Sequence, residues 1–320
     1  MAALLSATRD RLRWLGHRIS ATSFYNDTLP RLGHKFAALV RLMRLHRPIG
    51  AYLLLWPALW ALWLSSAGKP APDLLIVFTV GVFLTRSAGC AINDFADRNF
   101  DGKVQRTRDR PLASGELQPA TALVAFVLLA AAALGLLYVL NPLARYMALV
   151  GGALLVTYPL FKRFFPLPQF YLGIAYTWSV PMVYAAQNGT VPQLAWLVFI
   201  AGLLWTMAYD TMYAMVDRDD DLRIGLRSSA ILFGDADRTI IAAMQAMSLL
   251  ALGLVGRELQ LGPWFAGGLV AASLFATYEQ WLIRDRQRDR CFQAFLHSNY
   301  FGLAIFAGIA LDYLFRSTGA

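Results

Sequence analysis

The chain has 320 residues, of which 58% are hydrophobic and only 15% are charged. Because an ordinary soluble domain carries about 25% charged residues, this composition excludes a typical soluble protein. The net charge of +9 is expected to orient the chain in a lipid bilayer and to attract anionic headgroups. We do not expect it to mark a nucleic-acid surface.

Residues 1–40 form a basic arm ahead of the first long apolar segment. The arm contains spaced arginines, few acidic residues and no long apolar core of a secretory signal. We expect a helix lying on the cytoplasmic membrane surface, and an organelle-targeting presequence is the alternative. Residues 41–320 are expected to form the membrane-embedded domain.

Apolar segments of about 17–25 residues, the length that crosses roughly 30 Å of hydrocarbon, recur along the rest of the chain. They predict an all-α membrane protein whose transmembrane helices surround a central cavity. The nine predicted spans cover residues 49–67, 73–93, 119–140, 143–161, 169–187, 191–214, 239–256, 262–283 and 295–315.

The distribution of lysine and arginine supports this count, since these residues concentrate in cytoplasmic loops. Of the 29 basic residues, 24 fall ahead of the first span at residue 49 and in alternate loops, 4 fall on the other side, and Arg86 lies inside a span. The pattern predicts a cytoplasmic N-terminus and an external C-terminus. We expect the bacterial cytoplasmic (inner) membrane, with the mitochondrial inner membrane as the alternative.

The second and sixth predicted spans both end in acidic residues. In the first acidic motif, Asn93, Asp97 and Asp101 recur every four residues. At 3.6 residues per turn, this spacing predicts three side chains along one helix face. In the second motif, Asp217 and Asp221 repeat the four-residue step.

The two motifs also indicate an internal repeat. Shifting the numbering by 124 residues superposes the first motif on the second, with Asn93 on Asp217, and this shift equals four helices. We therefore predict two related four-helix units plus one further helix, in which each unit contributes an acidic edge to a shared cavity.

Stacked carboxylates repel one another on a helix, so a repeated acidic edge favours a bound cation over an ordinary solvated loop. Oxygen ligands without clustered His or Cys select a hard ion, and Mg²⁺ typically binds through one or two carboxylates plus substrate phosphates. The predicted metal ligands are Asn93, Asp97, Asp101, Asp217 and Asp221.

Basic residues follow each acidic motif and predict a clamp for a diphosphate, although the orientation of the chain alone explains many of them. The candidates are Lys103, Arg106, Arg110, Lys162, Arg163, Arg223 and Arg227. Arg86 lies two turns deeper than Asn93, where a charge is costly in lipid. It is expected either to anchor a substrate anion or to form a buried salt bridge with Asp210.

Around these motifs the sequence resembles the UbiA superfamily of intramembrane aromatic prenyltransferases, and most of all its branch that uses 4-hydroxybenzoate in ubiquinone synthesis. The resemblance covers about residues 41–315, and only the arm before residue 40 lies outside it. It rests on RPIG with LLLWP, GCAINDFADRNFDGKVQRTRDRPL, YPLFKRFFPLPQFYLGIAYTWSVPM and YDTMYAMVDRDDDLRIGLRSSAILFG.

The resemblance implies Mg²⁺-dependent transfer of a polyprenyl group from its diphosphate to the ring carbon ortho to the hydroxyl of 4-hydroxybenzoate. Asp97 and Asp217 are expected to act through the metal, and Arg86 is expected to fix the aromatic acid. The isoprenoid tail is expected to remain in the lipid bilayer. Further residues expected to contact the substrates are Arg47, Tyr158, Asp210 and Tyr213, and Tyr171, Tyr176 and Trp178 are further candidates for stabilising a carbocation.

Two competing functions remain open. Another branch of the superfamily would act on homogentisate, a naphthoate, a chlorophyll precursor or haem, and only product analysis separates these acceptors. A transporter would also place polar residues in its helices. However, transporter sites lie near the bilayer midplane, whereas both acidic motifs are predicted at one membrane face.

Overall fold

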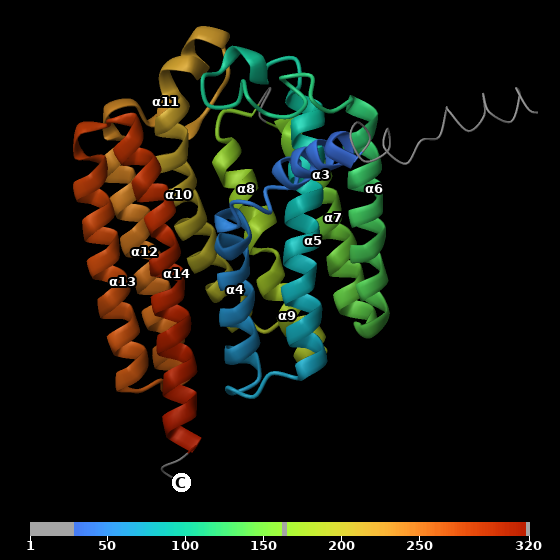
Figure 1. Cartoon of the computed structure of the whole chain (residues 1–320). Coiled ribbons are helices and arrows are strands. Elements are labelled where there is room, and N and C mark those ends of the chain that lie inside the picture. Colours follow the sequence, from blue (N-terminus) through green and yellow to red (C-terminus); the bar gives the residue numbers. More distant parts are fainter. Residues whose placement is uncertain (1–28, 162–164, 318–320) are drawn as a thin grey trace, which may run out of the picture.

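A computed structural model describes residues 29–161 and 165–317, which fold into a bundle of helices without a strand among them (Figure 1). The first group of helices in the bundle contains α4 (Ile49–Ser65), α5 (Pro72–Asp97), α6 (Pro119–Gly135) and α7 (Pro142–Phe161). The expected all-α fold is confirmed. The predicted residues Lys162 and Arg163 lie outside the described part of the chain.

The second group begins with α8 (Pro168–Thr177) and α9 (Ser179–Asn188), and continues with α10 (Gln193–Ile224), α12 (Asp237–Glu258) and α13 (Pro263–Leu282). The last helix is α14 (Arg288–Ser317). Short elements at the ends of the long helices are η2 (Asp101–Lys103), η3 (Leu136–Val139), α11 (Ser229–Phe233), η4 (Gly234–Ala236) and η5 (Ile283–Asp285).

The order of the helices supports the predicted repeat. The helices α4, α5, α6 and α7 begin at residues 49, 72, 119 and 142, and their counterparts α8, α10, α12 and α13 begin at 168, 193, 237 and 263. The corresponding starts are therefore 118–121 residues apart, and α14 is the helix left over.

The fifth predicted span, residues 169–187, is broken into α8 and α9 at Trp178. Pro181 explains the break, because a proline has no N–H to donate to the carbonyl four residues earlier and its ring clashes with that carbonyl. That carbonyl belongs to Thr177, the last residue of α8. The prediction of one continuous helix in this segment was wrong.

Within the described residues, five helical stretches are long and apolar enough to cross a membrane, by length and composition, and α4 is a shorter apolar helix. These five stretches are Pro72–Asp97, Pro119–Val139, Gln193–Arg223, Ser229–Glu258 and Arg288–Arg316. They support an integral membrane protein, whereas the predicted count of nine spans is not confirmed.

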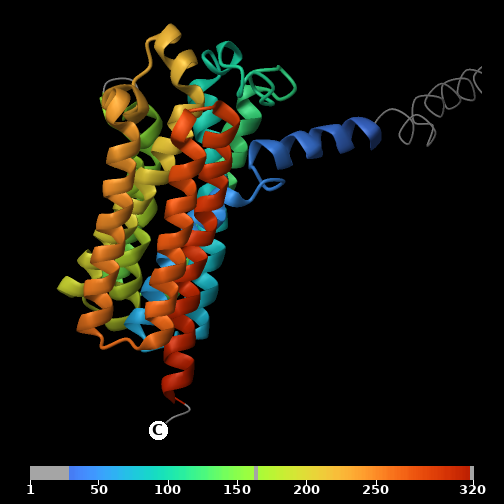
Figure 2. The same ribbon diagram turned by 90° about the vertical axis from the view of Figure 1, so that its left-hand side faces the viewer.

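The helix α3 (Leu29–Leu42) projects from the bundle at a steep angle to the long helices (Figure 2). It contains the described residues of the basic arm, 29–40, and continues two residues past the expected end of that arm. Ala38 and Leu42 are fully buried against the bundle, while Phe36 is 68% exposed. This amphipathic placement suits a helix that lies along a membrane surface.

A cluster of aromatic rings joins α4, α10 and α14 in the core of the bundle. The Trp60 and Trp205 ring centroids are 5.3 Å apart, and Trp205 stacks on Phe301 at 5.6 Å. The indole N–H of Trp60 donates a hydrogen bond to the Gly302 carbonyl at 3.0 Å. These contacts fix α10, which carries the second acidic motif, against the N-terminal and C-terminal helices.

The helices α13 and α14 touch through glycines. A Cβ atom on Gly268 would lie 2.8 Å from the backbone oxygen of Ala304 and 2.9 Å from the Cα of Gly308. Neither atom can move without shifting a helix. By contrast, a Cβ atom on the neighbouring Gly267 would have no heavy atom within 4 Å.

We predict that Gly268→Ala destabilises the protein by about 1–3 kcal/mol, the usual cost of overpacking a tight contact. The matched control Gly267→Ala is expected to leave the unfolding midpoint unchanged or slightly higher, because alanine is favoured over glycine in helices. Thermal unfolding of both purified variants in one detergent tests this. Equal midpoints would contradict the close packing of α13 on α14.

Candidate active site

A cavity of about 180 Å³ lies at one end of the bundle, where α5, α7 and α10 end and α8 begins. The loop between α5 and α6 (residues 98–118), called the α5–α6 loop below, forms one of its walls. The lining residues are Asp97, Phe100, Asp101, Val104, Arg106, Thr107, Arg110, Tyr158, Pro168, Gln169, Asp210, Tyr213, Ala214, Asp217, Asp221, Leu226, Arg227 and Ser228.

The cavity brings the two acidic motifs together, as the sequence predicted. Asp97 enters from α5, and Asp217 and Asp221 enter from α10. The helix α10 extends ten residues past the predicted end of the sixth span and ends at Gly225, whose φ of 72° suits a glycine. Both carboxylates of the second motif therefore lie on helix.

Asp101 reaches the cavity by a different route from the one expected. The helix α5 ends at Asp97, and Asp101 begins the 3-10 helix η2, so the prediction of three side chains along one helix face was wrong. The Asp101 carbonyl accepts a hydrogen bond from Thr107 Oγ1 at 2.8 Å, and its carboxylate pairs with Arg110 at 3.0 Å. These bonds within the loop compete with continuation of the helix.

The predicted Mg²⁺ ligands do not form a complete metal site by themselves. In the ranges 29–161 and 165–317, no group of three Asp, Glu, His or Cys side chains is arranged to hold a metal ion. Four predicted ligands line the cavity, and Asn93 is not among the lining residues described. An ion here would need oxygen ligands from a bound substrate as well.

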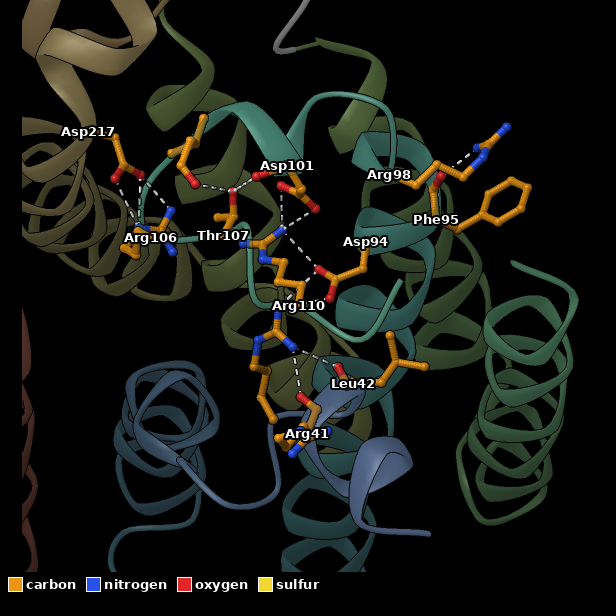
Figure 3. Close-up of polar contacts among 12 residues, drawn as sticks. Arg41, Leu42, Asp94, Phe95, Arg98, Asp101, Arg106, Thr107, Arg110 and Asp217 are labelled. Carbon is orange, nitrogen blue, oxygen red and sulfur yellow. Dashed lines mark hydrogen bonds and ion pairs between the residues drawn. The ribbon is translucent and has the colours of Figure 1, made fainter. Parts of the chain in front are cut away.

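Arg106 crosses the cavity and holds Asp217. Its Nε lies 3.0 Å from both carboxylate oxygens of Asp217. Its Nη1 donates to the Tyr213 hydroxyl, and its guanidinium carbon lies 4.5 Å from the centre of the Tyr213 ring. Figure 3 shows this pair beside the α5–α6 loop. The guanidinium thus neutralises a carboxylate of the second motif.

Arg110 neutralises the first motif in a similar way. Its Nη1 lies 3.0 Å from both Asp94 Oδ1 and Asp101 Oδ2, so that one guanidinium serves two carboxylates (Figure 3). Burial raises the pKa of the Asp101 carboxyl above its ordinary value, and Arg110 acts in the opposite direction. The residues around Arg110 therefore form a dense charged network at the edge of the cavity.

Several predicted substrate-binding residues are not among the cavity-lining residues that the structure describes. Arg47 and Lys103 are exposed, and Arg223 is 79% exposed beside Asp220. Arg86 lies on α5, about three turns before its acidic end, and its side chain reaches α4 and α8. A Cβ atom on Gly50 would lie 2.5 Å from Arg86 Nη2, and the Arg86 guanidinium lies 5.8 Å from the centre of the Tyr176 ring.

The Nε atom of Arg86 is buried without a hydrogen-bond partner. A buried charged donor without a partner is costly, and this position favours a ligand for the guanidinium. Of the predicted aromatics, Tyr158 and Tyr213 line the cavity. By contrast, the Trp178 Nε1 donates to the Met147 carbonyl at 2.8 Å, a contact that joins two helices.

Sequence reasoning missed Gln169 and Ser228, which also line the cavity. Gln169 Oε1 accepts a hydrogen bond from the backbone N–H of Ser229 at 2.8 Å, and this bond joins α8 to α11. The Ser228 hydroxyl is buried without a hydrogen-bond partner. No charge or spacing in the sequence distinguishes these residues, so only the fold reveals them.

Comparison with known proteins identifies the family. Residues 54–303 match the model of the UbiA prenyltransferase family. A 4-hydroxybenzoate octaprenyltransferase from Aeromonas hydrophila is 55% identical over 277 residues, which are 87% of this chain and 96% of that protein. A protein of the same name from Ectopseudomonas mendocina is 53% identical and covers 87% of this chain and 94% of its own length.

Solved structures agree with this result. The apo structure of a UbiA homologue from Aeropyrum pernix K1 matches 82% of this chain and 97% of its own with a TM-score of 0.72 and 25% identity. A UbiA homologue from Archaeoglobus fulgidus, bound to GPP and Mg²⁺, matches 85% of this chain and 99% of its own. Its TM-score of 0.61 at 15% identity shows that the two proteins share the fold. The chain belongs to the UbiA prenyltransferase family.

Proposed function

We propose that this protein transfers a polyprenyl group from polyprenyl diphosphate to the ring carbon ortho to the hydroxyl of 4-hydroxybenzoate, with release of diphosphate. The observation that carries the proposal is the single cavity where carboxylates of α5 and α10 face arginines of the α5–α6 loop. The relatives that are 50–55% identical over most of the chain and named 4-hydroxybenzoate octaprenyltransferases support this acceptor.

The carboxylates suit Mg²⁺ that is shared with the substrate. Asp97 and Asp217 lie on different helices around the cavity, and Mg²⁺ usually takes one or two carboxylates plus phosphate oxygens and water. Asp101 and Asp221 are further ligands in the proposal, and Asn93 is a candidate ligand one turn before Asp97. When bound, Mg²⁺ would supply charge neutralisation for the diphosphate that leaves.

The protein's own part in ionisation is to present positive charge to the leaving diphosphate. Arg106 and Arg110 project from the α5–α6 loop at the cavity. Arg106 is already paired with Asp217 at this cavity, so a diphosphate bound there would compete with that ion pair. We propose that Arg106 exchanges Asp217 for the diphosphate, leaving Asp217 for the metal.

The aromatic acid is proposed to bind deeper in the bundle than the diphosphate. Arg86 has a buried donor without a partner, and a guanidinium binds a carboxylate through two parallel hydrogen bonds. Holding the carboxylate of 4-hydroxybenzoate there would turn its ring toward the allylic carbon. Tyr158 and Tyr213 line the cavity and offer aromatic faces for the positive charge that develops on that carbon.

We propose that the cavity opens toward the cytoplasm in a bacterial cytoplasmic (inner) membrane. The basic residues of the α5–α6 loop support this orientation, because lysine and arginine favour cytoplasmic loops. The apolar surfaces of the bundle leave the isoprenoid tail in contact with lipid.

The most direct test of the activity is a product assay with purified protein, 4-hydroxybenzoate, a series of polyprenyl diphosphates and Mg²⁺. Mass spectrometry is expected to detect 4-hydroxybenzoate prenylated at the carbon ortho to the hydroxyl, with stoichiometric diphosphate. Homogentisate and a dihydroxynaphthoate serve as competing acceptors. Prenylation of either of these in preference to 4-hydroxybenzoate would refute the proposed acceptor.

The metal proposal predicts that Asp97→Ala and Asp217→Ala each lower kcat by roughly 100-fold or more, as expected when a group that stabilises transition-state charge is lost. Both proteins should still fold and insert, because the two carboxylates face a cavity. The matched control is Asp219→Ala, whose side chain is 68% exposed beside Arg288. Near-normal activity of Asp97→Ala or Asp217→Ala at limiting Mg²⁺ would exclude the two-motif site.

The acceptor proposal predicts a selective effect of Arg86→Lys, which keeps the charge but loses the planar pair of donors. The KM for 4-hydroxybenzoate is expected to rise roughly tenfold or more, the effect of losing one charge-assisted hydrogen bond. The KM for the prenyl diphosphate should change much less. An equal change in both values would assign Arg86 to the diphosphate or to the structure of the bundle.

A further inference from the structure

Asp94 is an acidic residue of the first motif that the proposed chemistry does not use. It lies on α5 between Asn93 and Phe95, and only 1% of its surface is exposed. It is not among the described residues that line the cavity. A carboxylate buried this deeply is retained only with charged partners, and Asp94 has two of them.

The first partner, Arg110, comes from the α5–α6 loop. Its Nη1 lies 3.0 Å from Asp94 Oδ1, and the same nitrogen contacts Asp101 in the cavity wall at 3.0 Å (Figure 3). Asp94 therefore fixes the guanidinium that in turn holds Asp101. A shift of Arg110 would move a proposed metal ligand and the loop that carries Arg106.

The second partner, Arg44, comes from the turn that connects α3 to α4. Its Nη2 lies 3.0 Å from Asp94 Oδ1 and 2.9 Å from Asp94 Oδ2. Its Nη1 donates to the Arg41 carbonyl at 2.7 Å, in the last turn of α3. Arg44 also has a positive φ of 58°, which is unusual for a residue with a side chain. Its bond to the Arg41 carbonyl holds the guanidinium in addition to the ion pair with Asp94.

A second ion pair makes the same connection at the other end of the loop. Arg41, in the last turn of α3, pairs with Glu116 in the α5–α6 loop. Apolar packing connects the same three segments, because Leu42 of α3 lies in one buried cluster with Ala91 of α5 and Leu117 of the loop. The end of α3, the end of α5 and the α5–α6 loop thus form one connected unit.

We propose that Asp94 is a positioning residue through which the helix α3 holds the α5–α6 loop over the active site. It acts through Arg110 on Asp101, and through Arg44 it connects the loop to the last turn of α3. Both carboxylate oxygens of Asp94 are engaged by arginines, and its absence from the described cavity lining separates it from the four proposed carboxylate ligands. The catalytic consequence rests on the proposed function, whereas the mechanical link does not.

The link is tested by the mobility of the loop in protein reconstituted into lipid nanodiscs, without any substrate. A spin label is placed at Arg108→Cys, because the Arg108 side chain is 63% exposed and pairs only weakly with Asp109 at 3.8 Å. Cys90 and Cys291, which are free and buried, are replaced by alanine. Electron paramagnetic resonance then reports the motion of the label.

Asp94→Asn is expected to shift the label from slow to fast motion, and Arg44→Gln is expected to produce the same shift from outside the loop. Adding Arg44→Gln to Asp94→Asn should give little further change, because residues of one ion-pair network are not additive. The control Asp73→Asn changes an exposed acid at the opposite end of α5 and should leave the spectrum unaltered.

Kinetics provide the second readout. Asp94→Asn and Arg44→Gln should each lower kcat for diphosphate release roughly tenfold or more, as for a misplaced catalytic group, with a smaller change in KM for 4-hydroxybenzoate. If Asp94→Asn fails to insert, Arg44→Gln carries the test, since its side chain is 24% exposed. A label that stays slow in both variants, or effects that add independently, would overturn the proposal whatever the acceptor proves to be.

Discussion

Carboxylates gathered at one end of an apolar bundle need positive charge close to them, and this requirement organises the site. Arg106 holds Asp217, while Arg110 holds Asp101 and Asp94. Further along the same end of the bundle, Arg288 holds Asp220. Because the α5–α6 loop carries both Arg106 and Arg110, these ion pairs tie it to acids of α5 and α10. A bound metal ion would face these acids with positive charge, as the arginines do, and would release arginine side chains to bind the diphosphate.

The bundle makes this arrangement possible by bringing two distant segments of the chain to one place. The helices α5 and α10 occupy equivalent positions in the two repeated groups, and their acidic ends meet around one cavity. Aromatic contacts hold α10 between α4 and α14, so the second motif is carried by a rigid helix. The first motif is divided between the end of α5 and the α5–α6 loop, which forms one wall of the cavity.

The all-α membrane fold could be predicted from the sequence, because long apolar segments report burial in lipid directly. The two acidic motifs and the repeat were visible from the regular spacing of their polar residues. What could not be predicted depends on contacts between segments. Asp101 leaves the helix because Thr107 and Arg110 bind it, and nothing in the four-residue spacing reveals those partners. Similarly, Asp94 looks like one more acid of the motif until Arg44 is brought beside it by the fold.

In the proposed substrate complex, the arginine contacts to these carboxylates give way to a metal ion, and the released arginine binds the diphosphate. The most direct measurement is a structure of the protein in lipid with Mg²⁺ and a prenyl thiodiphosphate that ionises slowly. We expect metal density between Asp97 and Asp217, the diphosphate against Arg106, and loss of the Arg106–Asp217 ion pair seen here. An intact Arg106–Asp217 pair, with the metal and the diphosphate bound elsewhere, would contradict the proposed exchange.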